Sequence, residues 1–213
     1  MPDTSKHPGA LFDLDGVLID SEGIYTDFWS EIDHIYPTGV DDFAHVIKGC
    51  TLPYILETYF PAAAQQEHIK QMLKQHEESM EYRLFDGVFD FIAALKGHGI
   101  PMAIVTSSTR LKMSHMVGQL PEFAAMFTDI ITSEDVIHGK PDPEGYIIGA
   151  SRIGIAPKDC IVFEDSINGL LAGRSAGARV VAVATTNPRE KLQQYGDVII
   201  DSLKPSLITQ IFG

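Results

Sequence analysis

Six short apolar runs, rich in β-branched residues, recur along the chain and predict β-strands. They span 10–15, 102–107, 129–134, 160–165, 179–184 and 197–201. Amphipathic stretches at 87–99, 142–154 and 166–178 lie between these runs and predict helices. Strands that alternate with helices of this length form βαβ units, and hence an α/β fold with a parallel sheet. The runs are apolar throughout, as expected when helices cover both faces of the sheet.

Residues 21–84 break this rhythm, because they contain no convincing strand. Helical patterns at 23–36 and 67–84 are separated there by the turn-forming sequences "YPTG" and "FPAAA". We therefore expect a helical-bundle cap domain at 21–84, inserted directly after the first strand. The sheet and its covering helices are expected to form a core from 1–20 and 85–213.

Composition narrows the class of protein and of partner. The 213 residues are 45% hydrophobic and 21% charged, which is ordinary for a globular protein, and the formal net charge is −13. Such an acidic chain is a poor partner for nucleic acid. No apolar run approaches the ~20 residues of a membrane-spanning helix, and the first ten residues lack a signal pattern. We expect a cytoplasmic, monomeric protein with Cys50 and Cys160 as reduced thiols.

Polar side chains gather at the carboxyl ends of the predicted strands, where parallel sheets bind ligands. These residues are Asp13, Asp15, Thr106, Ser107, Glu164 and Asp165, with Lys140 in the "HGKPDPEG" segment between the third and fourth strands. A buried carboxylate is costly unless it is paired, hydrogen-bonded or bound to a metal. As residues i and i+2 of one strand, Asp13 and Asp15 are expected to project to the same side. We interpret this convergence as a chemical site.

The residue types suit phosphoryl transfer. Carboxylates and backbone oxygens are the ligands that Mg²⁺ prefers, so the candidate metal ligands are Asp13, Asp15, Glu164 and Asp165. A carboxylate such as Asp13 can act as a nucleophile and form an aspartyl-phosphate. Asp15 would then protonate the departing alcohol and later deprotonate the attacking water.

The phosphoryl group also needs partners of its own. The candidate phosphate-binding groups are the Thr106 hydroxyl, the Ser107 backbone N–H and the Lys140 ammonium. Gly16 would let the chain turn beside the site without a side chain that blocks it.

The segments "DLDGVLIDSE", "IVTSS", "GKPDP" and "VFEDSINGLLAGRSAG" resemble the four motifs of the haloacid dehalogenase superfamily. They are similar to its phosphatase and β-phosphoglucomutase branch, which carries a helical cap after the first motif. The resemblance implies a Rossmann-like core and Mg²⁺-dependent phosphoryl transfer through an aspartyl-phosphate.

The resemblance also implies a role for each matching residue. Asp13 would be the nucleophile and Asp15 the general acid and base. Thr106 and Lys140 would bind phosphate. Asp165 would be a metal ligand, and Glu164 either a ligand or a partner of one. An aspartate at position 15 separates this chain from the dehalogenases themselves.

Two activities of this superfamily are candidates for the function, that of a small-molecule phosphatase and that of β-phosphoglucomutase. The mutase carries an arginine that grips the non-transferring phosphate, and Leu52 of "IKGCTLPYIL" stands at the matching position. Tyr25 stands where the mutase has a histidine. A bisphosphate intermediate needs a cation at each end, so we favour a phosphatase acting on a sugar phosphate or a similar small metabolite. The alternatives are a phosphomutase and a non-catalytic phospho-accepting signalling module, against which Asp15 and the cap argue.

The cap is expected to select the substrate. Candidate lining residues are Glu22, Tyr25, Lys48 and Thr51, together with Arg110 just after the second motif. Trp29, also near the first motif, is expected in the core of the cap, because an aromatic residue on an amphipathic helix is commonly a packing residue.

Overall fold

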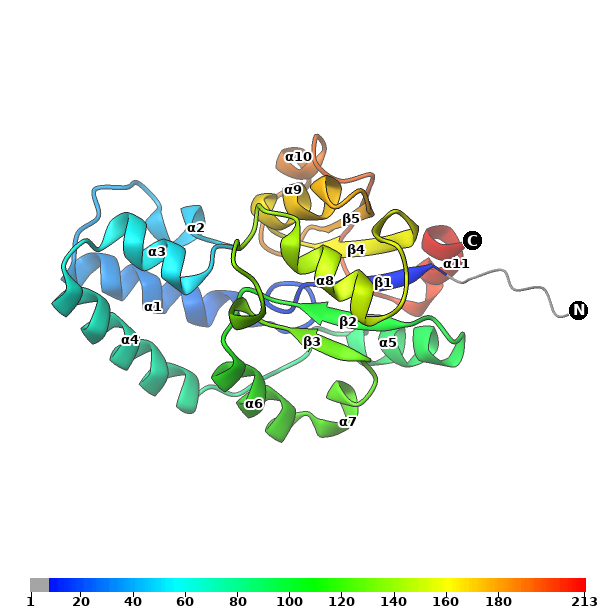
Figure 1. Ribbon diagram of the computed structural model, residues 1–213, viewed down its shortest axis with the longest axis horizontal. Helices are drawn as coiled ribbons and strands as arrows, with labels where there is room; N and C mark the ends of the chain where they lie inside the picture. The colour runs from blue at the N-terminus through cyan, green and yellow to red at the C-terminus, as the bar shows by residue number, and fades with distance from the viewer. Residues whose placement is uncertain (1–7) are drawn as a thin grey trace, which may run out of the picture.

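A six-stranded parallel sheet forms the centre of the computed structural model, which describes residues 8–213 except the side chain of Glu22. The strands are β1 (Gly9–Phe12), β2 (Met102–Val105), β3 (Asp129–Ile131), β4 (Cys160–Glu164), β5 (Arg179–Val183) and β6 (Val198–Ile200). Their order is β3-β2-β1-β4-β5-β6 (Figure 1). All six strands expected from the sequence are present, and each is shorter than its apolar run.

The early end of the first strand changes the expected setting of the two aspartates. It ends at Phe12, so Asp13 and Asp15 lie in the loop that follows and not on the strand itself. Gly16 has a φ of +79°, and the chain turns back there so that Ile19 forms a bridge with Asp15. The expectation that the two aspartates belong to the strand is therefore wrong, although both of them line the same cavity.

Helices cover both faces of the sheet, as the uniformly apolar strands predict. After the insert they are α5 (Val88–Gly97), α6 (Arg110–Gln119), α7 (Pro121–Ala124), α8 (Glu144–Arg152), α9 (Ile167–Ser175), α10 (Arg189–Leu192) and α11 (Ile208–Phe212), with 3-10 turns at Ser133–Asp135, Pro157–Asp159 and Pro205–Leu207. The helices expected at 87–99, 142–154 and 166–178 correspond to α5, α8 and α9.

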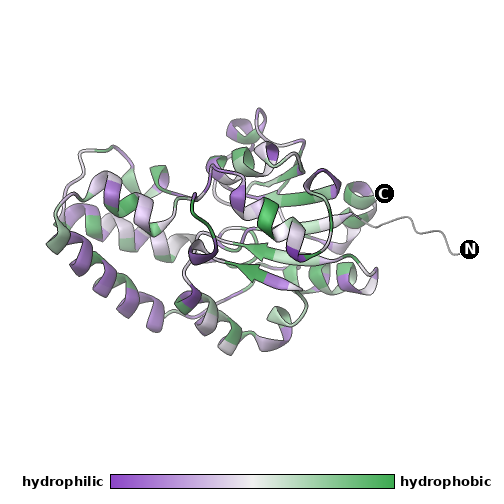
Figure 2. Ribbon diagram, in the orientation of Figure 1, coloured by the Kyte–Doolittle hydropathy of each residue, from purple (hydrophilic) through white to green (hydrophobic). Residues whose placement is uncertain are grey.

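Adjacent residues of β1 face the two apolar layers, because side chains alternate along a strand. Phe12 stacks on Phe163 with ring centroids 4.5 Å apart and belongs to the cluster that includes α5, α6 and α11. Leu11 packs on the opposite face with Ala150 of α8 and Ala172 of α9. The strands are accordingly mostly hydrophobic in Figure 2, where α4 is largely hydrophilic.

Between β1 and α5 lie four helices, named here the helical insert: α1 (Glu22–Ile35), α2 (Phe43–Val46), α3 (Leu52–Tyr59) and α4 (Ala63–Glu78). The helix expected at 67–84 is α4, which begins and ends earlier. The insert has an apolar cluster of its own, which includes Trp29, Phe43 and Phe60. It extends to one side of the sheet (Figure 1). None of the helices within 8–213 combines the length and apolar character that crossing a bilayer requires.

Candidate functional site

A buried lysine joins the loop after β1 to the end of β4. The Lys140 ammonium donates hydrogen bonds to Asp13 Oδ1 at 2.5 Å, to Glu164 Oε1 at 2.5 Å and to the Val105 carbonyl at 3.1 Å. The Lys140 side chain is only 7% exposed. A buried charge of this kind is tolerated only when it is paired and hydrogen-bonded. The ammonium therefore holds three segments together at the carboxyl edge of the sheet.

Glu164 is fully buried, and both of its oxygens accept several hydrogen bonds. Oε1 accepts from the Tyr146 hydroxyl at 2.8 Å as well as from Lys140. Oε2 accepts from the backbone N–H groups of Asp165 and Ser166 at 3.1 Å, and from the Ser166 hydroxyl at 3.0 Å. Glu164 thus fixes Lys140 on one side and the start of α9 on the other.

Three carboxylates meet at this point. Oxygen atoms of Asp13, Glu164 and Asp165 all lie within 4.8 Å of one another, and all three residues are buried. Lys140 is the cation bound to two of them, so the group carries excess negative charge. Burial raises the pKa of Asp13 to about 8, since Glu164 adds to the rise and only Lys140 opposes it. A hard divalent cation such as Mg²⁺ fits this donor set.

The carboxylate of Asp15 does not belong to that group. It binds the Lys112 ammonium through both oxygens, at 2.7 and 2.6 Å. The Ser108 hydroxyl donates to Oδ2 at 2.9 Å, and the Ser21 hydroxyl donates to Oδ1. Against the effect of burial, Lys112 lowers the pKa of Asp15 below its ordinary value. Asp15 is therefore held as a carboxylate next to the metal-type cluster and not within it.

Lys112 is a residue of the candidate site that was not expected from the sequence. It lies on α6, its side chain is 2% exposed, and its ammonium sits 4.2 Å from the centre of the Tyr25 ring. The Tyr25 hydroxyl donates to Glu77 of α4 at 3.0 Å. Contacts thus run from Asp15 through Lys112 into the helical insert. No motif marks Lys112, because its burial depends on how α6 packs.

Two glycines allow these close approaches. A Cβ added to Gly16, whose φ is +79°, would lie 2.1 Å from Asp165 Oδ2. A Cβ added to Gly169 in α9 would lie 1.7 Å from Glu164 Oε1. The carboxylates therefore occupy space that any other residue at positions 16 and 169 would fill.

The loop after β2 lies along the same edge. Thr106 is buried, and its hydroxyl oxygen accepts a hydrogen bond from the Ser108 backbone N–H at 3.1 Å. The Ser107 hydroxyl donates to the carbonyl of Gly49 in the helical insert at 3.0 Å. The structure thus brings Thr106 and Ser107 beside Asp13, as the topology predicts.

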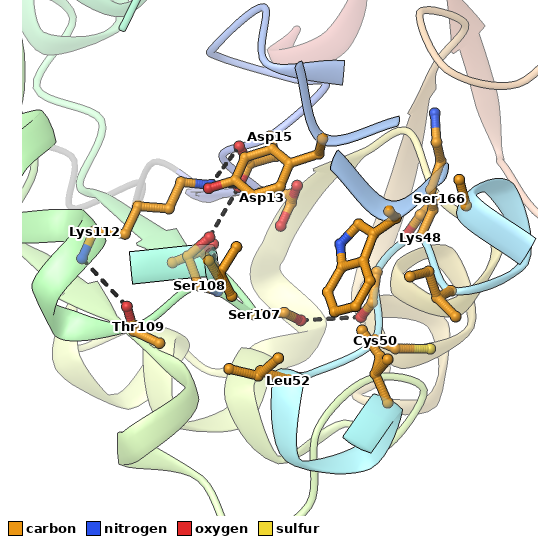
Figure 3. Close-up of a pocket in the computed structure, with 18 of the residues that line it drawn as sticks. Asp13, Asp15, Lys48, Cys50, Leu52, Ser107, Ser108, Thr109, Lys112 and Ser166 are labelled. Atoms are coloured by element: carbon orange, nitrogen blue, oxygen red, sulfur yellow. Dashed lines mark hydrogen bonds and ion pairs between the residues drawn. The ribbon is translucent and has the colours of Figure 1, made fainter. Parts of the chain in front are cut away.

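A cavity of about 130 Å³ separates this edge from the helical insert. Asp13, Asp15 and Asp165 line it from the core. Figure 3 shows Lys112 and Ser108 on the side of Asp15, with Leu52 and Cys50 opposite, on the insert. The cavity is therefore bounded by charged groups on one wall and by the insert on the other.

Some of the insert residues expected to contact substrate line the cavity, and others do not. Tyr25 and Lys48 line the cavity, and so does Trp29, which also packs in the core of the insert. Thr51 does not line it, because it is buried against the Gly139 backbone beside Lys140. The Glu22 side chain lies outside the described residues.

Arg110, which was expected to face a substrate, does not line this cavity. It is the first residue of α6, and its guanidinium pairs with Asp135 instead of lining the cavity. The backbone N–H of Arg110 donates to Glu134, which fixes the start of the helix. Two residues further on, Lys112 reaches Asp15 in its place.

Comparison with known proteins gives consistent matches. A profile described as haloacid dehalogenase-like hydrolase matches residues 10–183. The chain is 29% identical to hexitol phosphatase A from Escherichia coli strain K12 over 95% of this chain and 94% of the relative. It is 30% identical to validoxylamine A 7′-phosphate phosphatase from Streptomyces hygroscopicus subsp. limoneus, over 91% and 93%.

A solved structure shares the fold. The crystal structure of β-phosphoglucomutase from Clostridium difficile superposes with a TM-score of 0.75 at 20% identity, and the match covers 97% of each chain. Together these matches confirm the resemblance that the four sequence motifs predict.

The contact between Gly169 and Glu164 leads to a stability prediction. We expect Gly169→Ala to destabilise the protein by at least about 1–3 kcal/mol, because the new methyl group must displace a carboxylate held by five hydrogen bonds. Gly118→Ala is the control: this glycine lies in α6, a Cβ there meets nothing within 4 Å, and the change should stabilise by about 0.4–1 kcal/mol. Urea unfolding measures both, and equal stabilities would contradict the packing described.

Proposed function

The chain belongs to the haloacid dehalogenase-like hydrolases, and we propose that it is a Mg²⁺-dependent phosphatase that hydrolyses a small phosphorylated metabolite through an aspartyl-phosphate. Its relatives are phosphatases of small phosphorylated compounds, and the chain is a phosphoric monoester hydrolase like them. The observation that carries the proposal is the position of Asp13. This carboxylate lies where Lys140, two further carboxylates and the cavity meet.

Asp13 is the proposed nucleophile. Lys140 binds Asp13 Oδ1 at 2.5 Å, which orients the carboxylate and reduces its repulsion of an incoming phosphoryl group. Attack on phosphorus would form the Asp13 acyl-phosphate and release the alcohol. Water would then cleave the new P–O bond and regenerate Asp13.

Asp13 and Asp165 are the proposed direct ligands of Mg²⁺, with a backbone oxygen of the β1 loop. Glu164 would act mainly by holding Lys140 and the start of α9, since five hydrogen bonds already reach its oxygens. When bound, Mg²⁺ neutralises charge on the phosphoryl oxygens. The buried negative excess around Asp13 supports this assignment.

The loop after β2 would bind the phosphoryl oxygens, and Lys140, whose three donors already reach Asp13, Glu164 and the Val105 carbonyl, would attract them through its charge. Thr106 and Ser107 line the cavity beside Asp13, and a hydroxyl and a backbone N–H are suitable donors. These donors are preorganised by contacts with Ser108 and Gly49. Preorganised donors at the position of developing charge are the main source of such catalysis.

Asp15 is the proposed general acid and base. Its carboxylate is fixed by Lys112, Ser108 and Ser21 at the edge of the cavity. The ionised form is the one needed to deprotonate the hydrolytic water. The negative charge of a bound phosphate raises the proton affinity of Asp15, which favours the protonated form for the first step.

Phosphatase activity is favoured over mutase activity by the far wall of the cavity. A mutase needs a cation there for its second phosphate, and Leu52 lines that wall. The described residues of the insert that line the cavity offer Lys48 as a cation but no arginine, and a lysine lacks the paired donors with which a guanidinium binds a phosphate. We propose that the helical insert acts as the cap, with the domain boundaries near 20/21 and 84/85, and shields the aspartyl-phosphate from bulk water.

Asparagine at positions 13 and 15 tests the two roles. Asp13→Asn should reduce hydrolysis of p-nitrophenyl phosphate to background, because the amide is not a nucleophile. Asp15→Asn should lower turnover by about 10²–10⁴-fold and accumulate phosphoenzyme, since p-nitrophenolate departs without a proton. Mass spectrometry after acid quench detects the added phosphoryl group.

The control for these variants is Asp20→Asn, which changes an exposed carboxylate just after the same loop and should leave turnover unaltered. Robust hydrolysis by a clean Asp13→Asn preparation would overturn the assignment.

Lys112→Met tests how Asp15 is held ionised. Without the ammonium the pKa of Asp15 rises, so the loss of activity on the acidic side should begin at a higher pH than in the unaltered protein. Turnover should also fall by about tenfold or more. The pH dependence of kcat measures this shift. Lys74→Met, at an exposed lysine of α4, is the control, and an unmoved acidic limb in Lys112→Met would argue against the role.

Mg²⁺ affinity should depend on pH. Protons compete with the metal for Asp13, so affinity should rise by up to about tenfold per pH unit as pH increases towards 8 and then level off. Calorimetric titration between pH 6 and 9 measures the trend. Asp165→Asn should weaken binding strongly. Asp142→Asn, in an exposed second cluster with His138 and Glu144, should not, and the reverse pattern would place the metal elsewhere.

A further inference from the structure

The wall of the cavity that faces away from Asp13 is mostly apolar. Its residues come from the helical insert: Trp29, Ala44, Ile47, Leu52, Ile55 and Leu73. Trp29, Ile47 and Ile55 are buried residues of the cluster inside the insert. In the proposed mechanism the phosphoryl group binds at the core, so this wall would face the leaving alcohol.

Hydroxyl groups near that wall already have partners within the protein. The Tyr25 hydroxyl donates to Glu77, the Ser107 hydroxyl to the Gly49 carbonyl, and the Ser108 hydroxyl to Asp15. A polyhydroxylated leaving group would bring several donors and acceptors into this space. The donors of these three protein hydroxyls are already used, so acceptor oxygens of the polyol would lose hydrogen bonds to water without gaining these partners, which weakens binding.

Few charged groups lie on this side of the cavity. Among the described lining residues the cations are Lys48 and Lys112, and the Lys112 ammonium is bound to both oxygens of Asp15. Glu77 is buried and accepts from Tyr25. Burial also raises the pKa of the Cys50 thiol to about 11, so Cys50 presents a neutral, weakly polar surface.

We propose that the substrate is a phosphate monoester whose alcohol carries an apolar group, aromatic or alkyl, instead of a chain of hydroxyls. This inference rests on the proposed phosphatase activity and names the class of leaving group that its cavity accepts. The apolar group would pack against Trp29, Ile47 and Leu52 while the ester oxygen stays near Asp15. It differs from the polyol phosphate that the name of the hexitol phosphatase relative suggests.

Two esters separate these classes without a difference in chemistry. 2-Phenylethyl phosphate and sorbitol 6-phosphate both release a primary alcohol, so any difference in kcat/KM reflects binding of the leaving group. We expect the phenylethyl ester to be preferred by at least about tenfold, because an apolar pocket discriminates 10–200-fold for each well-packed group. Release of inorganic phosphate measures both rates.

Leu52→Asn tests whether the preference for the phenylethyl ester depends on the apolar wall of the cavity. Leu52 is a half-buried residue at the start of α3, so an amide is accommodated there without loss of a core side chain. The variant should raise KM for the phenylethyl ester by about fivefold or more and leave its kcat nearly unchanged. Ile137→Asn, at an 85% exposed residue outside the cavity, should change neither constant. Thermal unfolding checks that both variants are folded.

These outcomes test the class of leaving group and the phosphatase activity separately. Equal rates, preference for sorbitol 6-phosphate, or an unchanged KM in Leu52→Asn would overturn the apolar leaving group while hydrolysis of p-nitrophenyl phosphate sustains the phosphatase. If p-nitrophenyl phosphate is not hydrolysed with Mg²⁺ present, the phosphatase activity fails and the inferred substrate class fails with it.

Discussion

The ammonium of Lys140, held between Asp13 and Glu164, is the interaction on which the rest of the site depends. A buried lysine and two buried carboxylates are each costly to remove from water, and only their mutual pairing offsets that cost. Because Asp13 follows β1, Glu164 ends β4 and Lys140 precedes α8, the pairing is possible only when β1 and β4 are neighbours and the segment before α8 folds back over them. The strand order is thus what allows the buried charges of the site to pair.

Lys140 does not neutralise all three carboxylates of the cluster, and the surrounding groups stabilise these carboxylates unequally. Donors from Tyr146 and Ser166 saturate Glu164, and a glycine at 169 makes room for it. Asp13 does not receive comparable support, which is why burial raises its pKa. The protein therefore stabilises the carboxylate that organises the site and leaves the proposed nucleophile to be completed by a cation. This difference separates a structural carboxylate from a reactive one.

Most of the fold and the centre of the site could be predicted from the sequence because both follow from strand periodicity. Apolar runs locate the strands, and the rule that parallel strands expose their carboxyl ends on one edge brings Asp13, Thr106 and Asp165 together. The rule does not extend to helices. Lys112 and Arg110 are two residues apart on α6, and only the packing of that helix decides that the lysine faces Asp15. Arg110 was chosen because it lies just after the second motif, but Lys112 is the cation that reaches Asp15.

The same limit applies to the helical insert, whose helices were predictable but whose contacts were not. Tyr25 and Glu77 lie far apart in sequence, yet they meet over Lys112 and so connect α1 and α4 of the insert to Asp15. The Ser21 hydroxyl, in the segment that leads into α1, binds the same carboxylate. The groups that hold Asp15 are therefore themselves in contact with the insert. On the proposed mechanism the insert would act in two ways, since it bounds the space for the leaving alcohol and supports the position of the proposed acid and base.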